Sequence, residues 1–405
     1  MRSERAAKAG LRPRIFMMDL WAIVPYYTAY LSRALISEGA DVRVGSISYY
    51  LDPTCYSGRG LRVDPGLMDV VGRFRLPRTP RRILKLGEAM LNLAALSVRF
   101  SFSPPAVVHV QYLPMLKWRV PLDLWFLRLC RARGSKIMLT VHDLLPHDTA
   151  DQHKQTFLQL YSFVDGIICH SDHIRTRLAS EFAVAEEKVS VIPHGPFFYD
   201  LPGGDPAETL RQFGAIPGAV MVLWQGIIFP YKGLDLLLSA WQRVEAAHPS
   251  ACLVVAGTGS PDLLAALQRQ IEDLKLTRVR LHPRFISTEE LVGLYRAADI
   301  VVYPYRAITT SGALATGLAL GKAMITSDLA VFRELLTNNQ DALLVDPADP
   351  DALAAAIVRL ANEPELREQF AAGIRAMNFG DASWRSIADR TVSAYDRLLL
   401  SPKIH

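Results

Sequence analysis

The segment spanning residues 300–334 constrains the fold of this chain more than any other part of the sequence. It opens with a short β-branched run, passes through a Pro/Arg loop, fills a helix-length stretch with Ala, Leu and Gly, and closes with a second apolar run. That order predicts a strand, a loop, a helix and another strand. In a parallel α/β sheet, such a turn places backbone N–H groups and the positive end of a helix beyond the carboxyl edge of the strand, where anions bind.

A cluster of small residues stands where this loop should meet the helix. Its members are Thr309, Thr310, Ser311 and Gly312. Glycine lets a phosphate approach the backbone, and the hydroxyls donate hydrogen bonds without adding bulk. The cluster favours a diphosphate-binding loop, and hydroxyls that only cap a buried helix are the second interpretation.

Length and composition indicate a chain with a sizeable core. It has 405 residues, 50% of them hydrophobic, which is enough for two or three domains. Asp19 interrupts the apolar run behind the basic N-terminus, and no segment reaches about eighteen apolar residues, so we expect neither a signal peptide nor a membrane-spanning helix. The cysteines show no paired spacing, which favours the cytoplasm and argues against a disulfide framework or a zinc module; they are Cys55, Cys130, Cys169 and Cys252.

The net charge of +5 is unevenly distributed. Residues 1–200 hold 26 Lys and Arg against 18 Asp and Glu. Much of the excess lies in six residues, namely Arg73, Arg75, Arg78, Arg81, Arg82 and Lys85. Each basic residue near an anionic membrane contributes about 1 kcal/mol, so these residues predict peripheral attachment to the inner face of the plasma membrane.

The apolar stretch behind this basic cluster fits an amphipathic helix in the membrane interface. Its apolar residues are Met90, Leu91, Leu93 and Leu96. A solvated basic loop that leads into an ordinary core helix is the alternative. No aromatic platform or nucleic-acid motif accompanies the basic residues, so we expect no nucleic-acid partner.

The order of predicted elements divides the chain into two α/β domains. Strands and helices alternate over residues 1–198, as in one doubly wound domain. Pro and Gly become dense between residues 196 and 218, which marks a boundary. A second α/β series follows over residues 199–380, and residues 381–405 form a terminal helix. Two parallel-sheet domains of similar size imply a cleft between them, with the strand ends pointing into it. We expect the ligand to bind in that cleft.

Two turns of the second domain are of the kind that holds phosphates. Gly226 follows one strand, and Lys232 stands at the start of the next helix, where an ammonium assists backbone donors in holding a diphosphate. Gly257 and Gly259 belong to a Gly-Thr-Gly turn behind another strand. A single turn of this kind is weak evidence for a phosphate site. The occurrence of both turns in one domain is stronger evidence.

Several segments, read in order, resemble family 4 glycosyltransferases with the GT-B fold. In the second half they are GIIFPYKGLDLLLSAW, LVVAGTGS, RFISTEELVGLYRAADIVVYPYR, TTSGALATGLALGKAMITSD and ASWRSIADRTVSAYDRL. In the first half, VHVQY, TVHDLLPHD, CHSDHIRTRL and VIPHG are similar to matching strand ends of that family. The resemblance spans nearly the whole chain and is strongest between residues 220 and 345.

The resemblance implies both a fold and an activity. The fold is a pair of Rossmann-like doubly wound domains facing across a cleft, with the helix of residues 381–405 returning to the N-terminal domain. The activity is retaining, metal-independent transfer from a nucleotide-diphosphate sugar, which is a substrate rather than a cofactor. The acceptor would be a glycan, a lipid-linked oligosaccharide or a small molecule, and the basic cluster favours the lipid-linked one.

The resemblance also assigns roles to residues. Lys232 matches the phosphate-binding lysine of the family, and the cluster of residues 309–312 falls where the diphosphate is held. Phe285 and Ile286 fall where the nucleobase is received. His142 matches the histidine that family members direct at the transferred sugar. Neighbouring His and Asp residues have no metal-ligand spacing, so we expect no metal site.

The chain departs from the family at three places. Family members usually carry an arginine shortly before the phosphate-binding lysine. In this chain the positions before Lys232 hold Ile227, Ile228 and Phe229 instead. The two usual glutamates are replaced by Ala307 or Ile308 and by Ala315 or Thr316, and Asp19 begins the segment that replaces a Gly-rich turn. These changes favour an alternative function, a catalytically degenerate GT-B protein that binds a sugar nucleotide or a partner. The donor, the acceptor and the oligomeric state stay open.

Overall fold

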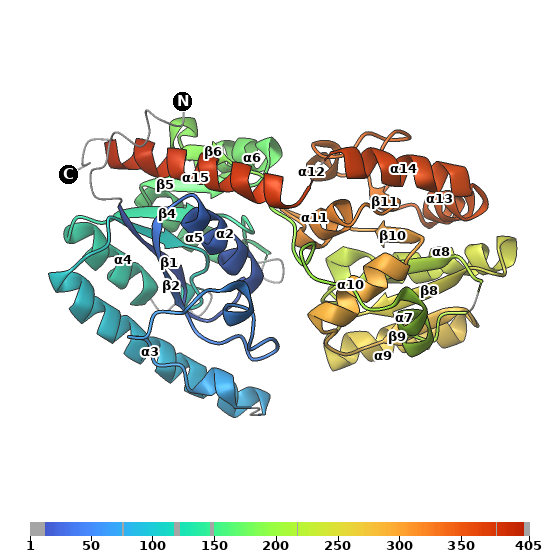
Figure 1. Ribbon diagram of the computed structural model, residues 1–405, viewed down its shortest axis with the longest axis horizontal. Coiled ribbons are helices and arrows are strands. Elements are labelled where there is room, and N and C mark those ends of the chain that lie inside the picture. Colours follow the sequence, from blue (N-terminus) through green and yellow to red (C-terminus); the bar gives the residue numbers. More distant parts are fainter. Residues whose placement is uncertain are drawn as a thin grey trace. The chain divides into compact units, whose positions relative to one another are not determined.

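The structure, a computed structural model, describes residues 13–74, 77–116, 122–145, 150–216, 218–377 and 379–400 (Figure 1). The chain divides into two compact units. The N-terminal unit comprises Met1–Pro193 and Trp384–His405, and the C-terminal unit comprises His194–Ser383. Each unit is a six-stranded sheet with flanking helices, so the prediction of two Rossmann-like domains is confirmed.

The sheet of the N-terminal unit has the strand order β2-β1-β3-β4-β5-β6, and all its pairs are parallel. Its strands are β1 (Arg14–Asp19), β2 (Asp41–Ser46), β3 (Val107–Val110), β4 (Lys136–Thr140), β5 (Gly166–Cys169) and β6 (Val189–Val191). The inner strands β3 and β5 are buried at every position. This matches the continuous apolar runs of the sequence, because a parallel sheet with helices on both faces buries both sides of its strands.

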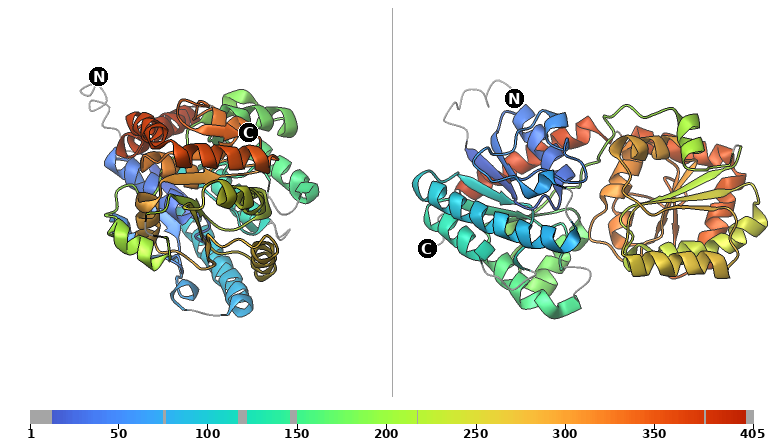
Figure 2. Two further views of the ribbon diagram at one scale, coloured as in Figure 1. Left: turned by 90° about the vertical axis from the view of Figure 1, so that its right-hand side faces the viewer. Right: turned by 90° about the horizontal axis from the view of Figure 1, so that it is seen from below.

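Six longer helices cover this sheet (Figure 2). They are α2 (Pro25–Ser37), α3 (Arg78–Phe102), α4 (Leu122–Ala132), α5 (Lys154–Phe163), α6 (Asp172–Phe182) and α15 (Asp381–Leu400). Short 3-10 turns also occur, among them η2 (Val71–Arg73). Within the described part of the chain, no helix is both long and apolar enough to cross a membrane.

Helix α3 begins at Arg78 and packs its apolar side on the sheet. Leu93 and Leu96 are 5% and 1% exposed and belong to the core, so the prediction that they face a membrane is wrong. The helical period turns them inward, and it turns Met90 and Leu91, which are 46% and 56% exposed, outward. Arg75 of the basic cluster lies outside the described residues.

Helix α15 packs on the N-terminal unit through aromatic contacts. Trp384 stacks on Tyr30 of α2, with ring centroids 5.5 Å apart and planes at 17°. The Tyr395 hydroxyl lies 2.5 Å from Nδ1 of His109, whose Nε2 lies 2.7 Å from the Thr140 hydroxyl. Burial lowers the pKa of His109 to about 3, so this imidazole is neutral and links helix and sheet by hydrogen bonds alone.

The sheet of the C-terminal unit has the strand order β12-β11-β10-β7-β8-β9, again with parallel pairs. Its strands are β7 (Met221–Gln225), β8 (Cys252–Ala256), β9 (Val279–His282), β10 (Ile300–Tyr303), β11 (Met324–Ser327) and β12 (Leu343–Val345). This is the doubly wound order, in which the chain reverses direction across the sheet between β7 and β10. Ligands bind at the carboxyl ends of the strands that flank such a reversal.

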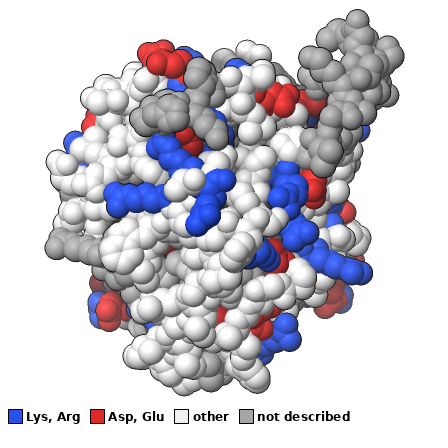
Figure 3. All heavy atoms as spheres, turned by 90° about the vertical axis from the view of Figure 1, so that its left-hand side faces the viewer, with Lys and Arg blue, Asp and Glu red and all other residues white. Residues whose placement is uncertain are grey.

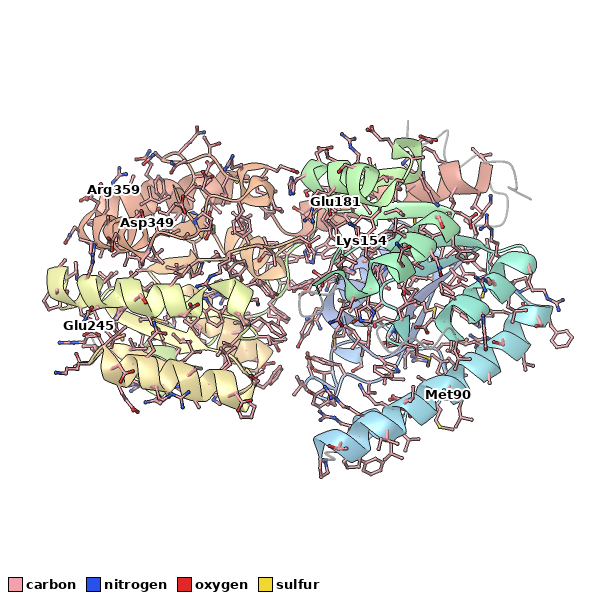
Figure 4. All side chains as sticks on the ribbon, turned by 180° about the vertical axis from the view of Figure 1, so that it is seen from behind. Met90, Lys154, Glu181, Glu245, Asp349 and Arg359 are labelled. Atoms are coloured by element: carbon pink, nitrogen blue, oxygen red, sulfur yellow. The ribbon has the colours of Figure 1, made fainter. Side chains whose placement is uncertain are left out.

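The helices of this unit are α7 (Pro206–Gln212), α8 (Leu234–Ala247), α9 (Pro261–Asp273), α10 (Thr288–Ala297), α11 (Gly312–Ala319), α12 (Ala330–Arg333), α13 (Pro350–Asn362) and α14 (Pro364–Ala376). Helices α7, α9, α10, α11 and α13 of this unit begin at a residue whose side chain caps the helix. Ser287 and Glu290 form a capping box at the start of α10. Asp349, labelled in Figure 4, caps α13 by accepting from the backbone amides of Asp351 and Ala352.

Candidate functional site

The candidate site of the C-terminal unit is built where β7 and β10 end side by side. These strands pair in parallel, with Val222 beside Ile300 and Leu223 beside Val301. Their following loops contain the Lys232 turn and the Thr309–Gly312 cluster. The sequence places the two segments about 80 residues apart, and the reversal of strand order brings both loops to one edge of the sheet.

Lys232 closes the 3-10 turn η6 (Pro230–Lys232), and Gly233 follows with φ of 64°. A side chain at Gly233 would overlap the carbonyl of Pro304, so the tight approach of the two loops requires glycine there. The Lys232 ammonium lies 5.7 Å from the centre of the Tyr305 ring. Among the described residues, no carboxylate forms an ion pair with it.

Burial lowers the pKa of Lys232 to about 8. A partly buried ammonium without an internal counter-ion is unfavourable in the free protein. The same ammonium gains strongly when an anion arrives, because a charge-assisted hydrogen bond contributes about 1.5–3 kcal/mol. The environment of Lys232 is therefore suited to a diphosphate.

Arg306 fixes the turn that carries Lys232. Its guanidinium donates two hydrogen bonds to the Asp235 carboxylate, at 2.8 and 2.6 Å, and one to the Pro230 carbonyl at 2.8 Å. Its backbone amide donates to the Tyr231 carbonyl at 2.7 Å. Sequence reasoning missed Arg306, and the signal was an arginine in the loop directly after the strand of residues 300–303.

The two predicted glycine turns meet beside Lys232. Gly226 and Gly257 have φ of 141° and 153°, which only glycine adopts without strain. A Cβ on Gly257 would lie 1.8 Å from the Gly226 carbonyl oxygen, and a Cβ on Gly226 would lie 2.8 Å from the Lys232 ammonium nitrogen. Gly259 packs on Ile228. The two glycine turns therefore pack against each other, and Gly226 packs against the Lys232 side chain.

The Thr-Thr-Ser-Gly cluster leads into α11. The Ser311 hydroxyl accepts from the Leu314 amide at 3.1 Å and is the N-cap of the helix, so the capping interpretation is confirmed for this residue. Thr309 is buried, and Thr310 and Gly312 are partly exposed. Among the residues that the structure describes, none accepts a hydrogen bond from the amides of Gly312 and Ala313. Capping by Ser311 thus leaves two donors at the helix start available to an anion.

The start of α11 also contacts the segment that opens the C-terminal unit. A Cβ on Gly312 would lie 2.7 Å from the Phe197 ring and 3.2 Å from the His194 ring. The Phe197 amide donates to the Thr316 hydroxyl at 3.2 Å, and this hydroxyl donates to the Gly312 carbonyl. Thr316 is one of the two candidates for the second glutamate position. Its hydroxyl is already bonded to two backbone groups, the Phe197 amide and the Gly312 carbonyl. His194 and Phe197 were missed as site residues, although VIPHG was noted as a motif.

Phe285 and Ile286 follow β9, one strand beyond β8. Ile286 is 9% exposed and packs in a core cluster with Leu294 and Tyr295. Phe285 is half-buried, and its carbonyl accepts from the Arg284 guanidinium at 3.1 Å. Of this pair, Phe285 presents more surface to a ligand.

His142 in the N-terminal unit follows β4. Its Nε2 lies 3.2 Å from Oε1 of Gln111, which follows β3, and its ring centre lies 4.8 Å from that of Tyr27 and 5.4 Å from that of His170. Neighbouring strands again bring these groups to one carboxyl edge. The contact with Gln111 orients the imidazole ring.

Asp19 ends β1 at the same edge. Its carboxylate accepts from the amides of Ile23 and Val24 at 2.9 and 3.0 Å, and from the Thr28 hydroxyl at 3.4 Å. Burial raises the pKa of Asp19 to about 6. The Asp19 carboxylate thus occupies the amides of Ile23 and Val24 just before α2. A glycine-rich turn at this place would leave such amides exposed. Among the described residues, no group of three or more His, Cys, Asp or Glu is arranged to bind a metal.

Two family models match the chain. Glycosyltransferase Family 4 matches residues 24–195, and Glycosyl transferases group 1 matches residues 219–363. A D-inositol 3-phosphate glycosyltransferase of Thermobifida fusca (strain YX) is 29% identical over 247 residues, which are 58% of this chain and 56% of that protein. One of Geodermatophilus obscurus is 26% identical over 391 residues, 91% of this chain and 83% of that protein.

The first curated relatives are longer than the matched region, since the chain spans 53% to 65% of their length. Among solved structures, Anabaena Alr3699/HepE in complex with UDP-glucose has a TM-score of 0.73 at 17% identity and covers 94% of this chain and 100% of that chain. The two doubly wound sheets and the likeness to this solved structure define the class of the fold, which is GT-B. Within this class, the chain belongs to glycosyltransferase family 4.

Proposed function

We propose that this chain is a retaining, metal-independent glycosyltransferase that moves a hexose from a nucleotide-diphosphate sugar to an acceptor. One observation carries the proposal. The Lys232 ammonium is partly buried without a carboxylate partner among the described residues, at the reversal of strand order and beside the loop that leads into α11. A cation in that setting is best explained by an anionic ligand.

Breaking the anomeric bond places negative charge on the leaving diphosphate. Lys232, the hydroxyls of Thr309 and Thr310, and the amides of Gly312 and Ala313 are the groups proposed to stabilise this charge. The sugar develops positive, oxocarbenium-like charge, and His142 is assigned to that side. Preorganised donors of this kind usually supply the largest share of rate enhancement.

The relatives suggest which donors to test first. Anabaena Alr3699/HepE was solved with UDP-glucose, so uridine diphosphate sugars lead the series. Binding of a nucleoside diphosphate to the native state raises the melting temperature according to RT ln(1 + [L]/Kd). A melting screen against UDP, GDP, ADP and TDP identifies the base before any acceptor is known.

The acceptor is proposed to be lipid-linked, as in polysaccharide biosynthesis, with the protein held peripherally at an anionic cytoplasmic membrane surface. Support comes from the basic cluster around the start of α3, where Arg73 and Arg82 are exposed. A glycan or small-molecule glycoside is the alternative acceptor.

The decisive experiment measures release of nucleoside diphosphate from a panel of nucleotide sugars, with and without lipid-linked acceptors. We expect turnover with the sugar whose nucleotide raises the melting temperature. Product analysis by NMR then gives the anomeric configuration, and inversion would contradict the retaining mechanism. Activity that requires added divalent metal would contradict metal independence.

A second function is favoured by specific contacts. The hydroxyl of Thr316 is occupied by the Phe197 amide, and Phe229 stacks on Tyr231 where the family has its arginine region, with centroids 5.7 Å apart. Both features replace polar contacts to a donor, as in a binding module without catalysis. Thermal stabilisation by a nucleoside diphosphate without turnover on any donor would select this function.

A further inference from the structure

The solvent-facing side of α3 is apolar over most of the helix. Six large apolar side chains between residues 83 and 102 are 46% to 87% exposed, namely Ile83, Leu84, Met90, Leu91, Val98 and Phe102. Every other exposed position in this range is glycine or alanine. Soluble monomers rarely expose so long an apolar surface, so it marks an interaction site.

These side chains form one continuous stripe. Leu84, Leu91 and Val98 are spaced by seven residues and therefore lie along one side of the helix. The twenty residues from Ile83 to Phe102 span about 30 Å along the axis. Met90, labelled in Figure 4, points outward from α3.

The opposite side of α3 fixes the orientation of the stripe. Glu88 accepts from the amides of Val70 and Val71 at 2.6 and 3.2 Å. The Asn92 side chain exchanges two hydrogen bonds with the backbone of Met68, at 2.7 and 2.9 Å. The only polar groups near the middle of the helix are thus bonded to the protein, and rotation of the stripe into the core would break these contacts.

The surroundings of the stripe are basic and aromatic. Arg82 is exposed beside its start, and Trp125, 55% exposed, and Arg128 lie on the neighbouring helix α4. Among the described residues of η2, α3 and α4, no Asp or Glu is exposed. Figure 3, which looks onto one end of the N-terminal unit, shows more Lys and Arg surface than Asp and Glu surface. Tryptophan and arginine around an apolar stripe are typical of a membrane interface.

We propose that α3 lies in the plane of an anionic bilayer, with its exposed stripe inserted at the boundary between headgroups and acyl chains. This proposal deepens the membrane attachment of the proposed function and stands independently of its catalytic part. A second copy of the chain fits the surface less well, since a two-fold contact through it would offer no carboxylate to Arg82. Anionic headgroups supply that charge.

Insertion of the apolar stripe can be distinguished from purely electrostatic attachment. Lys85 donates to the Trp21 carbonyl at 3.2 Å, and the Arg81 guanidinium lies 4.1 Å from the centre of the Tyr50 ring, so two of the basic residues are engaged within the unit. Apolar contacts are not screened by salt, whereas exposed charges are. Binding by the stripe should therefore survive salt that removes purely electrostatic adsorption.

The test is sedimentation of the full chain with vesicles of phosphatidylcholine and phosphatidylglycerol, at 0.1 and 0.5 M NaCl. The double variant Leu91→Gln, Val98→Gln changes two exposed residues and should keep the fold. We expect it to bind vesicles at least tenfold more weakly at both salt concentrations. The matched control is Ile36→Gln, because Ile36 is 43% exposed on α2 of the same unit and should not affect binding.

Three results would overturn the proposal: vesicle binding equal in the double variant and the wild type, binding abolished by 0.5 M NaCl in the wild type, and absence of vesicle binding with a dimer that the double variant dissociates. UDP-induced stabilisation and donor hydrolysis are measured on the same samples. If the double variant loses vesicle binding but keeps UDP-induced stabilisation and donor hydrolysis, the proposal is supported. If the wild type shows neither UDP-induced stabilisation nor donor hydrolysis, only the catalytic assignment is contradicted.

Discussion

Replacing Lys232 with methionine should stabilise the free protein while weakening nucleotide binding. The pKa of Lys232 is lowered from 10.5 to about 8 by burial. One pKa unit corresponds to about 1.4 kcal/mol, so a shift from 10.5 to about 8 means that the charge destabilises the folded state by at most about 3.5 kcal/mol. Partial exposure reduces this figure, and we expect Lys232→Met to gain about 1–3 kcal/mol at pH 7.

The sign of the pH dependence follows from linkage. Between pH 8 and 10.5, the unfolded wild type binds more protons at this residue than the folded protein does. The wild type therefore gains stability as pH rises through this window, and Lys232→Met lacks that gain. The advantage of the variant should be full below pH 8 and absent above about 10.5. Urea unfolding at several pH values measures it.

The same variant loses a charge-assisted contact to the diphosphate, so UDP or the matching nucleotide should bind about ten- to hundredfold more weakly. Lys322→Met is the control, because the Lys322 ammonium donates to the carbonyls of Arg296 and Ala298 at 2.8 and 2.9 Å. It should destabilise the protein and leave nucleotide binding unchanged. A destabilised Lys232→Met protein with wild-type nucleotide affinity would contradict the assignment of Lys232 to a diphosphate site.

Three further predictions concern single residues. His142→Ala should lower kcat more than tenfold with unchanged melting response to nucleotide, and intact turnover would remove it from the catalytic set. Arg306→Met should raise the donor KM severalfold because the turn loses its clamp, whereas Arg333→Met, which removes a comparable surface pair with Asp328, should leave KM unchanged. Gly257→Ala should lower the melting temperature by several degrees, since its Cβ would overlap a carbonyl; Gly87→Ala, with open space around it, should not.

The sequence predicts the fold well because apolar runs and turn residues act locally. The apolar run that opens residues 300–334 is the strand β10, and Ser311 of the small-residue cluster caps α11, which was the second interpretation of that cluster. Strand ends are harder to predict, as at Val110, where β3 ends although the Gln111 amide still donates to the Met18 carbonyl of β1. Composition alone therefore does not mark where the pairing of two strands stops.

The candidate site was predictable in its residues and only partly in its contacts. Lys232 and the two glycine turns follow from motif spacing, and the structure brings them together. Arg306 and Phe197 were not predictable, because their roles depend on which loops meet across the sheet. For the same reason, the sequence could not show that Thr316 holds the Phe197 amide or that Asp19 accepts from the amides at the start of α2.

The stripe on α3 illustrates a limit of composition. The sequence marks an apolar stretch behind the basic cluster, but its inward and outward residues separate only once the helix is packed. Leu93 enters the core while Leu91 faces solvent, two residues away. The burial pattern therefore identifies the exposed apolar stripe of α3, and the charges in the sequence identify only its vicinity.

The most direct test of the central claim is a crystal structure of the chain with its nucleoside diphosphate. We expect the diphosphate to accept hydrogen bonds from the Lys232 ammonium and from the Gly312 amide at the start of α11. A diphosphate bound elsewhere, or a helix start closed by the Phe197 ring with Lys232 turned away from the ligand, would contradict it.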